Sequence, residues 1–401
     1  MRILHVTPYY EQAWAYGGIP RVVAALATGL SALGHSITVC TTDACLPDER
    51  CPRPAGSSFF TGWRDTTSSG VEVRTFANVS NRLAYHQQLF LPLGLLSYLR
   101  THVRDFDVAH IHACRNVPGV AAARYLRRAR VPYIVAPNGT APILERRRLA
   151  KQLFDGTLGR RFLDHADQLI AVTEAERRQL EALHAPPTHI AVIPNPVDLA
   201  QFDPPLVRGT FRRDAGLGTD PVVLFLGKLT PRKRLDVVAR AFADLVQPGA
   251  RLVVAGNDMG YEPALSRLVH TLRLGDRYVR IGLLAGRARL EALADADVVV
   301  YPSQDEVFGL VPLEAILCGA PVVVAGDSGC GQIVRNVGGG LVVEQGSVPA
   351  LTRAVTDILN SPDEWRRQVA SAGQRVRDLY GSAVVCRQVE ALYRSVTGSS
   401  T

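Results

Sequence analysis

Residues 298–321 read VVVYPSQDEVFGLVPLEAILCGAP, and no other segment of the chain is as informative. The run from Val298 to Tyr301 is typical of a buried strand, because it is β-branched and aromatic and ends at a proline. Gly309 then opens an apolar helical pattern. Ligands of parallel α/β sheets bind beyond the carboxyl ends of the strands. We therefore expect Glu306 to lie in a ligand-binding loop.

The helix predicted after Gly309 points its free N–H groups and its positive dipole end at the same loop. Such an end binds phosphate or the oxygens of a sugar. Glu314 lies in the first turns of this helix and can reach toward the same place. Two carboxylates beside an anion site make chemical sense as acceptors for neutral hydroxyls, one set on a sugar and one on a ribose. The alternative is a solvated helix face, which two glutamates at this spacing often form.

A second informative segment, residues 224–234, reads LFLGKLTPRKR. Gly227 follows a predicted strand, and the cations Lys228, Arg232, Lys233 and Arg234 come directly after it. Lysine is a compact charge and arginine a planar fork, so together they could neutralise a diphosphate. The alternative is a charged helix start exposed to water.

The whole chain alternates β-branched runs with helical patterns, which predicts parallel sheets wrapped by helices. We expect strands at 2–6, 36–41, 108–111, 133–135, 169–172 and 190–193 in a first half, and at 222–226, 252–255, 279–281, 298–301 and 322–325 in a second half. A proline-rich stretch, 195–221, is interpreted as the linker. The predicted class is α/β, with two doubly wound, Rossmann-like domains that face each other across a cleft.

The predicted boundaries place an acceptor-binding domain at 1–205 and a nucleotide-binding domain at 206–380. The last segment, 381–401, contains a helical pattern that could cross back to the first domain. Thr173-Glu174-Ala175-Glu176 is a capping box, which predicts a helix start of structural importance. Gly17 and Gly18 follow the first strand and either let the backbone approach a ligand or make a tight turn.

Four motifs in this order resemble the retaining glycosyltransferases of family 4: Gly17-Gly18, residues 192–202 (VIPNPVDLAQF), the loop Gly227 to Lys233, and Glu306 to Glu314. The resemblance covers nearly the whole chain. It implies the GT-B fold, a nucleotide-diphosphate sugar as co-substrate and no metal or other cofactor.

The resemblance also implies roles for single residues. Lys228 and Lys233 would hold the donor diphosphate beside Gly227, Glu306 would contact the donor-sugar hydroxyls, and Glu314 would contact the ribose. The remaining implied contacts come from backbone groups, at Gly17, Gly18, Phe308, Gly309, Leu310 and Val311.

Three positions depart from the family pattern. Lys228 stands where arginine is usual, Asn138 stands where a histidine often lies near the donor sugar, and Gln332 stands where a glutamate is normal. Asn138 can form hydrogen bonds but cannot titrate. It therefore remains a candidate for contact with the sugar or the acceptor.

His110 and His112 alternate at the end of a predicted strand and so share one face of the sheet. Either histidine could contact a sugar or an acceptor, or both could be hydrogen-bonded structural residues. No acidic or thiol residue stands at metal-ligand spacing from them, so no metal site is predicted.

The formal net charge of the 401 residues is +8, and the segment 120–161 accounts for this whole excess. Apolar residues interleave with its cations, as in a helix that lies in a membrane interface, or as in an ordinary helix with a basic face. We expect peripheral contact with an anionic membrane surface, and no binding of nucleic acid because no recognised motif accompanies the charge.

Seven cysteines without metal-site spacing are typical of a reduced, cytoplasmic protein, and the first residues lack the apolar core of a signal peptide. The expected function is retaining, metal-independent transfer of a sugar, of the hexosyltransferase type, to a glycan or lipid-linked acceptor in cell-surface polysaccharide assembly. A catalytically silent nucleotide-sugar-binding scaffold is the alternative. A nicotinamide-dependent oxidoreductase is disfavoured because the chain lacks G-x-G-x-x-G after its first strand.

Overall fold

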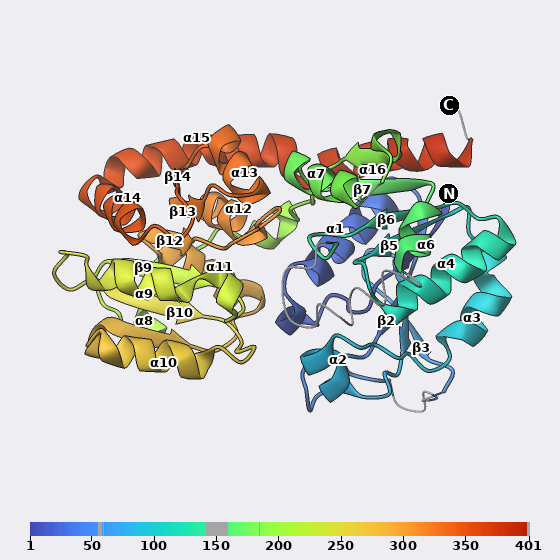
Figure 1. Ribbon diagram of the computed structural model, residues 1–401, viewed down its shortest axis with the longest axis horizontal. Helices are drawn as coiled ribbons and strands as arrows, with labels where there is room; N and C mark the ends of the chain where they lie inside the picture. The colour runs from blue at the N-terminus through green and yellow to red at the C-terminus, as the bar shows by residue number, and fades with distance from the viewer. Residues whose placement is uncertain (55–57, 59, 142–158, 184, 399–401) are drawn as a thin grey trace. The chain divides into compact units, whose positions relative to one another are not determined.

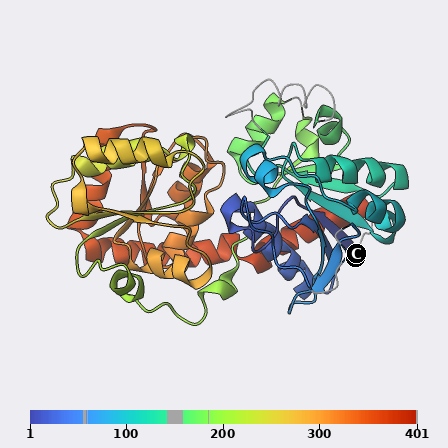
Figure 2. The ribbon, with the colours of Figure 1, turned by 90° about the horizontal axis from the view of Figure 1, so that it is seen from below.

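The computed structural model describes residues 1–54, 58, 60–141, 159–183 and 185–398. The chain divides into two compact units, unit 1 with Met1–Pro196 and Ser382–Thr401, and unit 2 with Val197–Gly381. The division therefore falls nine residues before the boundary expected at 205, and the last helix belongs to unit 1. Each unit is a sheet with helices on both faces (Figure 1, Figure 2), which confirms the predicted α/β class.

The sheet of unit 1 has eight strands in the order β3-β4-β2-β1-β5-β6-β7-β8, parallel except for β3 against β4. The strands are β1 Arg2–Val6, β2 Ser36–Thr42, β3 Trp63–Thr66, β4 Glu72–Phe76, β5 Val108–His112, β6 Tyr133–Ala136, β7 Gln168–Ala171 and β8 Ile190–Val192. The α-helices described in this unit are α1 Ile19–Ala32, α2 Asn81–Gln87, α3 Leu95–His102, α4 Val117–Ala129, α6 Arg160–Asp164, α7 Glu174–Ala182 and α16 Ser382–Thr397.

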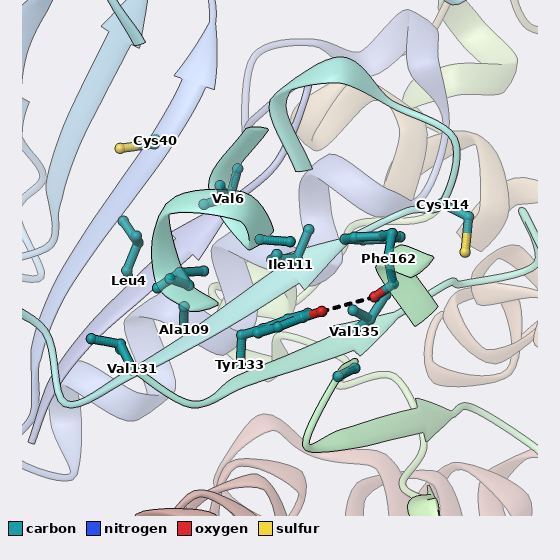
Figure 3. Packing of buried hydrophobic residues seen from close by; sticks show 14 of the residues in the cluster. Leu4, Val6, Cys40, Ala109, Ile111, Cys114, Val131, Tyr133, Val135 and Phe162 are labelled. Atoms are coloured by element: carbon teal, nitrogen blue, oxygen red, sulfur yellow. Dashed lines mark hydrogen bonds between the residues drawn. The ribbon is translucent and has the colours of Figure 1, made fainter. Parts of the chain in front are cut away.

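A continuous hydrophobic cluster packs against the strands of unit 1 (Figure 3). Ile111 and Val135 contribute from β5 and β6, and Phe162 contributes from α6. The hydroxyl of Tyr133, a fully buried ring, donates a hydrogen bond of 3.0 Å to the carbonyl of Phe162. Aromatic rings bury a large apolar area, and this bond satisfies the one polar atom that the tyrosine brings into the core.

The sheet of unit 2 has six parallel strands in the order β11-β10-β9-β12-β13-β14. The strands are β9 Val222–Leu226, β10 Arg251–Ala255, β11 Tyr278–Ile281, β12 Val298–Tyr301, β13 Val322–Ala325 and β14 Gly340–Val343. The α-helices described here are α8 Thr210–Asp214, α9 Leu235–Ala243, α10 Glu262–Thr271, α11 Gly286–Asp295, α12 Leu310–Leu317, α13 Gly329–Val337, α14 Val348–Asn360 and α15 Pro362–Tyr380.

All the predicted strands exist within about one residue of their expected bounds, but three strands were missed. β3 and β4 each carry two charged residues, and β14 begins with glycine, so none of them has the apolar run of a central parallel strand. The predicted linker, 195–221, was also wrong in part. It contains a 3₁₀ turn, Leu199–Phe202, and helix α8, which packs on α11.

Helix α16 packs on α1 within unit 1. Gly29 of α1 lies against the thiol of Cys386, where a β-carbon would overlap the sulfur. His35 Nε2 lies 3.1 Å from Glu390 Oε1, and Tyr393 reaches β5. The final helical pattern is therefore part of the core of unit 1. None of the helices that the structure describes is both long and apolar enough to cross a membrane.

Candidate active site

The two charged loops predicted from the sequence meet in unit 2. Strands β9 and β12 are hydrogen-bonded neighbours in the sheet, so the loops at their carboxyl ends lie side by side. Hydrogen bonds join these loops: the Gln304 N–H donates to the Arg232 carbonyl at 2.8 Å, and the Arg232 guanidinium donates to the carbonyls of Asp305 at 3.0 Å and Gln304 at 3.3 Å. The cation loop and the acidic loop therefore form one surface.

Lys233 is the centre of this surface. Its Nζ lies 2.5 Å from Glu306 Oε2, 2.5 Å from the Tyr301 hydroxyl and 4.4 Å from the centre of the Tyr301 ring. Burial alone would lower the pKa of Lys233, but the charge of Glu306 and the Tyr301 hydroxyl raise it above its ordinary value. Burial likewise acts to raise the pKa of Glu306, and Lys233 outweighs it and holds that pKa low. Both side chains therefore stay charged around neutral pH.

The N-terminus of α12 lies at the end of the same loop. Gly309 precedes the helix with a φ of 79°, and a β-carbon there would come within 2.6 Å of Cys330 Sγ. The N-cap residue, Gly309, offers no side-chain cap to the first N–H groups of the helix. Phe308 and Val311 are buried, with their side chains in the core, and contact of their backbone groups with a ligand stays a prediction. Gly309 thus lets the chain bring an uncapped, positively polarised helix end to the surface around Lys233.

Gly227 and Lys228 complete the same edge. The Gly227 N–H donates to the Ala255 carbonyl at 2.9 Å, and a side chain at Gly256 would overlap the Gly227 carbonyl. Lys228 follows directly and is half-buried. The close backbone approach at these two glycines therefore fixes the position of the Lys228 backbone at the end of β9.

Two serines that the sequence analysis missed also lie at this edge. Ser303 follows β12 and Ser328 follows the neighbouring strand β13, and both residues are buried. Neither hydroxyl oxygen has a hydrogen-bond partner among the residues that the structure describes. A buried hydroxyl without a partner is costly, so such groups commonly meet a ligand or a water.

Glu314 lies in α12 but is only 2% exposed. Its Oε2 accepts a hydrogen bond from Nη1 of Arg289, an equally buried residue of α11 whose Nη2 donates to Gln201 Oε1 at 2.7 Å. The contact of Glu314 with a ribose stays a prediction. In this structure one oxygen of its carboxylate is bonded to Arg289, and the sequence pattern gave no sign of that partner.

In unit 1, Gly17 and Gly18 lie between a 3₁₀ turn, Trp14–Tyr16, and α1. Gly17 has a φ of 96°, and its N–H donates to the Trp14 carbonyl at 3.0 Å. Gly18 precedes α1 without a side-chain cap. The pair does form a tight turn, and it also leaves the first N–H groups of α1 uncapped. Their contact with a diphosphate remains a prediction.

His110 and His112 are buried, with 1% and 0% exposure. Contact of either histidine with a sugar or an acceptor stays a prediction. The ring of His112 stacks on His110 and on His5 of β1. The register places His5 opposite His110, and these two rings are tilted against each other. His110 Nδ1 lies 2.7 Å from the hydroxyl of Tyr393, and His5 Nδ1 lies 2.9 Å from His112 Nε2. Burial lowers the pKa of all three rings, that of His5 to about 3.

Within the described part of the chain, these three histidines form the group that could hold a metal ion. Their ligand atoms all lie within 4.8 Å of one another. The hydrogen bond between His5 and His112 uses one lone pair and one N–H. With neutral rings, only one of these two residues then has a lone pair free for a metal. A three-histidine site would require that this buried bond break.

Asn138 follows β6 at the carboxyl edge of the unit 1 sheet. Its Nδ2 donates to the Ala136 carbonyl at 3.1 Å, and its Oδ1 is buried without a hydrogen-bond partner among the described residues. Its contact with a sugar or an acceptor stays a prediction, for which the structure provides an acceptor atom that is not yet used.

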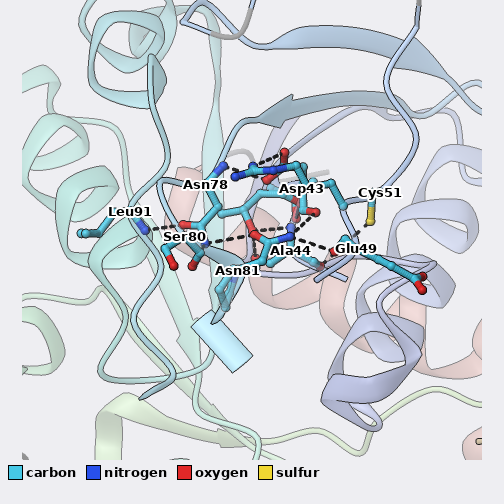
Figure 4. Close-up of polar contacts among 12 residues, drawn as sticks. Asp43, Ala44, Glu49, Cys51, Asn78, Ser80, Asn81 and Leu91 are labelled. Atoms are coloured by element: carbon cyan, nitrogen blue, oxygen red, sulfur yellow. Dashed lines mark hydrogen bonds and ion pairs between the residues drawn. The ribbon is translucent and has the colours of Figure 1, made fainter. Parts of the chain in front are cut away.

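A buried polar network lies farther along the same edge, after β2 and β4 (Figure 4). Asp43 accepts hydrogen bonds from the Arg50 guanidinium at 2.6 Å and from the Asn78 N–H at 2.7 Å. Asn78 in turn accepts from the Leu91 N–H at 2.7 Å. The carboxylate of Asp43 therefore joins the loop after β2 to the loop after β4, and Asn78 extends the network to Leu91. The partners of Asp43 account for its burial.

The basic segment predicted to contact a membrane is described only in part. Residues 142–158, which hold Arg146, Arg147, Arg148 and Lys151, lie outside the described residues. In the described portion, the cations of α4 and its end are exposed: Arg124, Arg127, Arg128 and Arg130. Contact with a membrane stays a prediction.

Two family models match the chain and together cover most of it. The glycosyl transferase 4-like domain matches residues 17–196, and the glycosyl transferases group 1 domain matches residues 207–376. The chain belongs to the GT-B glycosyltransferases. The two matched ranges correspond to the greater part of unit 1 and of unit 2.

Curated relatives of this glycosyltransferase are named D-inositol 3-phosphate glycosyltransferase. The protein of Kineococcus radiotolerans is 36% identical over 255 residues, 58% of this chain and 58% of that protein. The protein of Actinosynnema mirum is 40% identical over 190 residues, 44% of this chain and 45% of that protein. The chain thus spans about half the length of the curated relatives it matches.

Solved structures share the GT-B fold over the whole length of this glycosyltransferase. Sucrose-phosphate synthase from Thermosynechococcus elongatus has a TM-score of 0.77 and 21% identity, with all of both chains covered. Anabaena HepE in complex with UDP-glucose has a TM-score of 0.74 and 19% identity, covering 98% of this chain and all of that one. At this identity the likeness shows the fold alone.

Proposed function

We propose that the protein transfers a sugar from a nucleoside-diphosphate sugar to a hydroxyl of an acceptor, with retention of configuration and without a metal. The observation that carries the proposal is the surface around Lys233 in unit 2. There a charged lysine, a charged glutamate and an uncapped helix N-terminus share one sheet edge. Family membership and the UDP-glucose bound to HepE support a nucleotide-sugar donor.

The chemistry needs the nucleoside diphosphate to leave as the glycosidic bond loosens. Lys228, Lys233 and the N–H groups of α12 supply positive charge and dipoles for the phosphate oxygens, which lowers the barrier to departure. Glu306 accepts hydrogen bonds from sugar hydroxyls. No side chain at this edge is placed as a nucleophile, so we propose front-face substitution, in which a donor phosphate oxygen takes the acceptor proton.

The present contact between Lys233 and Glu306 has a consequence for donor binding. Nζ of Lys233 has three hydrogens, and two of them already serve Glu306 and Tyr301. The third remains for a phosphate oxygen, and Glu306 keeps its other carboxylate oxygen for a hydroxyl. The pair can therefore hold the diphosphate and the sugar at once without losing its own bond.

The acceptor proposed is a polyol or a lipid-linked glycan in cell-surface polysaccharide assembly, used in the cytoplasm at the inner face of the membrane. The names of the curated relatives support a phosphorylated polyol. The excess positive charge of residues 120–161 supports an anionic acceptor or membrane surface.

The first test is a thermal-shift panel of UDP, GDP and ADP, each with its common sugars. A ligand at 100 times its dissociation constant stabilises the folded protein by about 2.7 kcal/mol. One nucleotide series should raise the Tm, and the same sugar should then be transferred to D-inositol 3-phosphate or to a lipid-linked glycan. A panel without any shift contradicts the proposal.

Replacement of Glu306 by glutamine separates an enzyme from a silent nucleotide-sugar-binding scaffold. Transfer should fall steeply in Glu306→Gln while the thermal shift by the free nucleoside diphosphate persists, because the phosphate contacts remain. Purified wild-type protein that binds the donor but neither transfers nor hydrolyses it favours the scaffold.

A further inference from the structure

A buried carboxylate with no role in the proposed chemistry lies at the carboxyl edge of the unit 1 sheet. Glu176 is in the first turn of α7 and has no exposed surface. The capping box predicted here forms only on one side: Thr173 Oγ1 accepts the Glu176 N–H at 3.3 Å. The glutamate side chain bonds elsewhere. Its Oε2 accepts the Val172 N–H at 2.8 Å, and its Oε1 accepts the Gly139 N–H at 2.5 Å.

Gly139 belongs to the turn 137–140, which directly follows β6. Thr140 ties this turn at its other end, since its hydroxyl donates to the Pro137 carbonyl at 2.6 Å and accepts the Cys114 N–H at 2.7 Å. The Arg115 guanidinium also donates to the Thr140 carbonyl, at 2.6 Å. The turn is therefore held from β5, β6 and β7, and Glu176 supplies the bond from β7 and α7.

The residue that this turn displays is Asn138. Its φ is 52°, in the left-handed region, which asparagine tolerates better than most residues. Its Nδ2 is bonded to the Ala136 carbonyl, which fixes the side chain, while its buried Oδ1 has no partner among the described residues. A buried acceptor left unpaired is costly, so a donor that reaches Oδ1 removes that cost.

We propose that Glu176 is a positioning residue, which holds the turn 137–140 so that Asn138 Oδ1 accepts a hydrogen bond from a hydroxyl of the sugar donor or the acceptor. This inference rests on the proposed function. The carboxyl edge of a parallel sheet is where such ligands bind, and an amide oxygen suits a neutral hydroxyl.

A carboxylate is suited to this task because it offers two acceptor oxygens to two N–H groups. Glutamine has the same shape, but its NH₂ group would face one of the two N–H groups. Two donors cannot bond each other, so one of the two hydrogen bonds is lost. Burial raises the pKa of Glu176 to about 7, and the N–H groups of Val172 and Gly139 act to lower it.

A double-mutant cycle tests whether Glu176 acts through Asn138. The variants of the full chain are Glu176→Gln, Asn138→Gly and the two combined, since glycine removes the amide and tolerates a positive φ. Each single variant should lower kcat/KM for sugar transfer about tenfold, the equivalent of one hydrogen bond. The combined variant should be no slower than Asn138→Gly alone.

The matched control is Glu174→Gln, because Glu174 lies on the same helix turn but its side chain is 56% exposed and pairs only with Arg177. It should leave kcat/KM unchanged. A rise in the KM of the donor in Asn138→Gly assigns the hydroxyl to the donor sugar, and a rise in the KM of the acceptor assigns it to the acceptor. Losses that add in full in the combined variant overturn the inference, as does an unimpaired Glu176→Gln.

Hydrogen exchange of the Gly139 amide separates this inference from the proposed function. Exchange should accelerate in Glu176→Gln and stay at the wild-type rate in Glu174→Gln. If the wild-type protein turns over no donor at all, the proposed function fails. Unchanged protection of the Gly139 amide in Glu176→Gln overturns the positioning role, whether or not the protein turns over a donor.

Discussion

The carboxyl edges of the two sheets treat their titratable groups in opposite ways. In unit 2, Lys233 and Glu306 remain charged because each stabilises the other. In unit 1, His5, His110 and His112 are held neutral by burial, and burial pushes Glu176 toward its neutral form. An ionised edge suits a diphosphate, whereas an edge of neutral groups and free lone pairs suits hydroxyls.

The same contrast shows how each unit tolerates the burial of titratable side chains. Opposite charges that share hydrogen bonds can stay ionised when removed from water, but a buried charge whose partner is lost becomes a liability. Neutral histidines need no charged partner when they are buried. Because they resist protonation in the folded state, they make the free energy of unfolding depend on pH. Four changes to the protein test this comparison.

The largest effect is expected at the buried pair of Arg289 and Glu314 in unit 2. Replacing Arg289 with methionine leaves a carboxylate buried without its cation, and removal of one partner from a buried pair costs about 3–5 kcal/mol. The free energy of unfolding from urea titration measures this loss. The double variant Arg289→Met/Glu314→Leu should recover much of it, and a single variant as stable as wild type contradicts the role of the pair.

Replacement of Lys233 by alanine should reduce sugar transfer by about 100- to 1,000-fold, because one preorganised charge at a leaving group is worth about that much. Initial velocities at saturating donor measure the effect. Arg240→Ala provides the control, since Arg240 is an exposed cation of the neighbouring helix α9. Equal activity of the two variants would remove Lys233 from the site.

Acidification should destabilise the protein through the three buried histidines. Their pKa values are lowered in the folded state, so the unfolded chain binds more protons below pH 6.5, and stability falls from there toward the folded pKa of about 3 for His5. Each histidine can contribute up to about 1.4 kcal/mol per pH unit. Glu176 opposes this, because its raised pKa adds stability as the pH falls below about 7.

Urea midpoints between pH 7.5 and 5 measure that slope. His112→Gln should reduce it by up to one proton, and His165→Gln, a change at an exposed position of unit 1, should leave it as it is. A slope that all the variants share would mean that the histidine cluster does not set the acid sensitivity.

The smallest effect is expected at Ser328. Its buried hydroxyl has no partner among the described residues, so Ser328→Ala should leave the Tm unchanged or slightly raised. Donor affinity should fall about fivefold if the hydroxyl bonds the nucleotide sugar, the equivalent of about 1 kcal/mol. Calorimetric titration of the donor measures this, with the exposed Ser266→Ala of α10 as control. Unchanged donor affinity in Ser328→Ala would take this hydroxyl out of the donor site.

Much of the fold followed from local patterns. The central strands of both sheets are apolar runs that no other arrangement buries as well, and their order along the chain predicts parallel, doubly wound sheets. The strands β3 and β4 were not predicted because they carry charged residues and lie near a sheet edge, where strands are less buried than in the centre.

The site followed from the sequence only where its residues stand at strand ends. Lys233 and Glu306 are 73 residues apart. Each of them follows a predicted strand, and the carboxyl ends of parallel strands meet at one edge of the sheet. Arg289 beside Glu314 could not be predicted in this way, because it comes from the middle of a helix that shows no motif. Ser303 and Ser328 could not be predicted either, because nothing in the sequence distinguishes them from other loop residues. Only the structure shows that both serines are buried.

The sequence by itself determined the apolar central strands, where glycines allow close backbone approach, and which loops carry charge, because these depend on residues near one another in the chain. Only the tertiary structure decided that His5 joins His110 and His112, that Tyr393 meets them from the far end of the chain, and that Glu176 bonds Gly139. Those contacts join residues up to 283 positions apart. Their partners are chosen by packing, which fixes burial and hydrogen bonds together and leaves no periodic trace in the sequence.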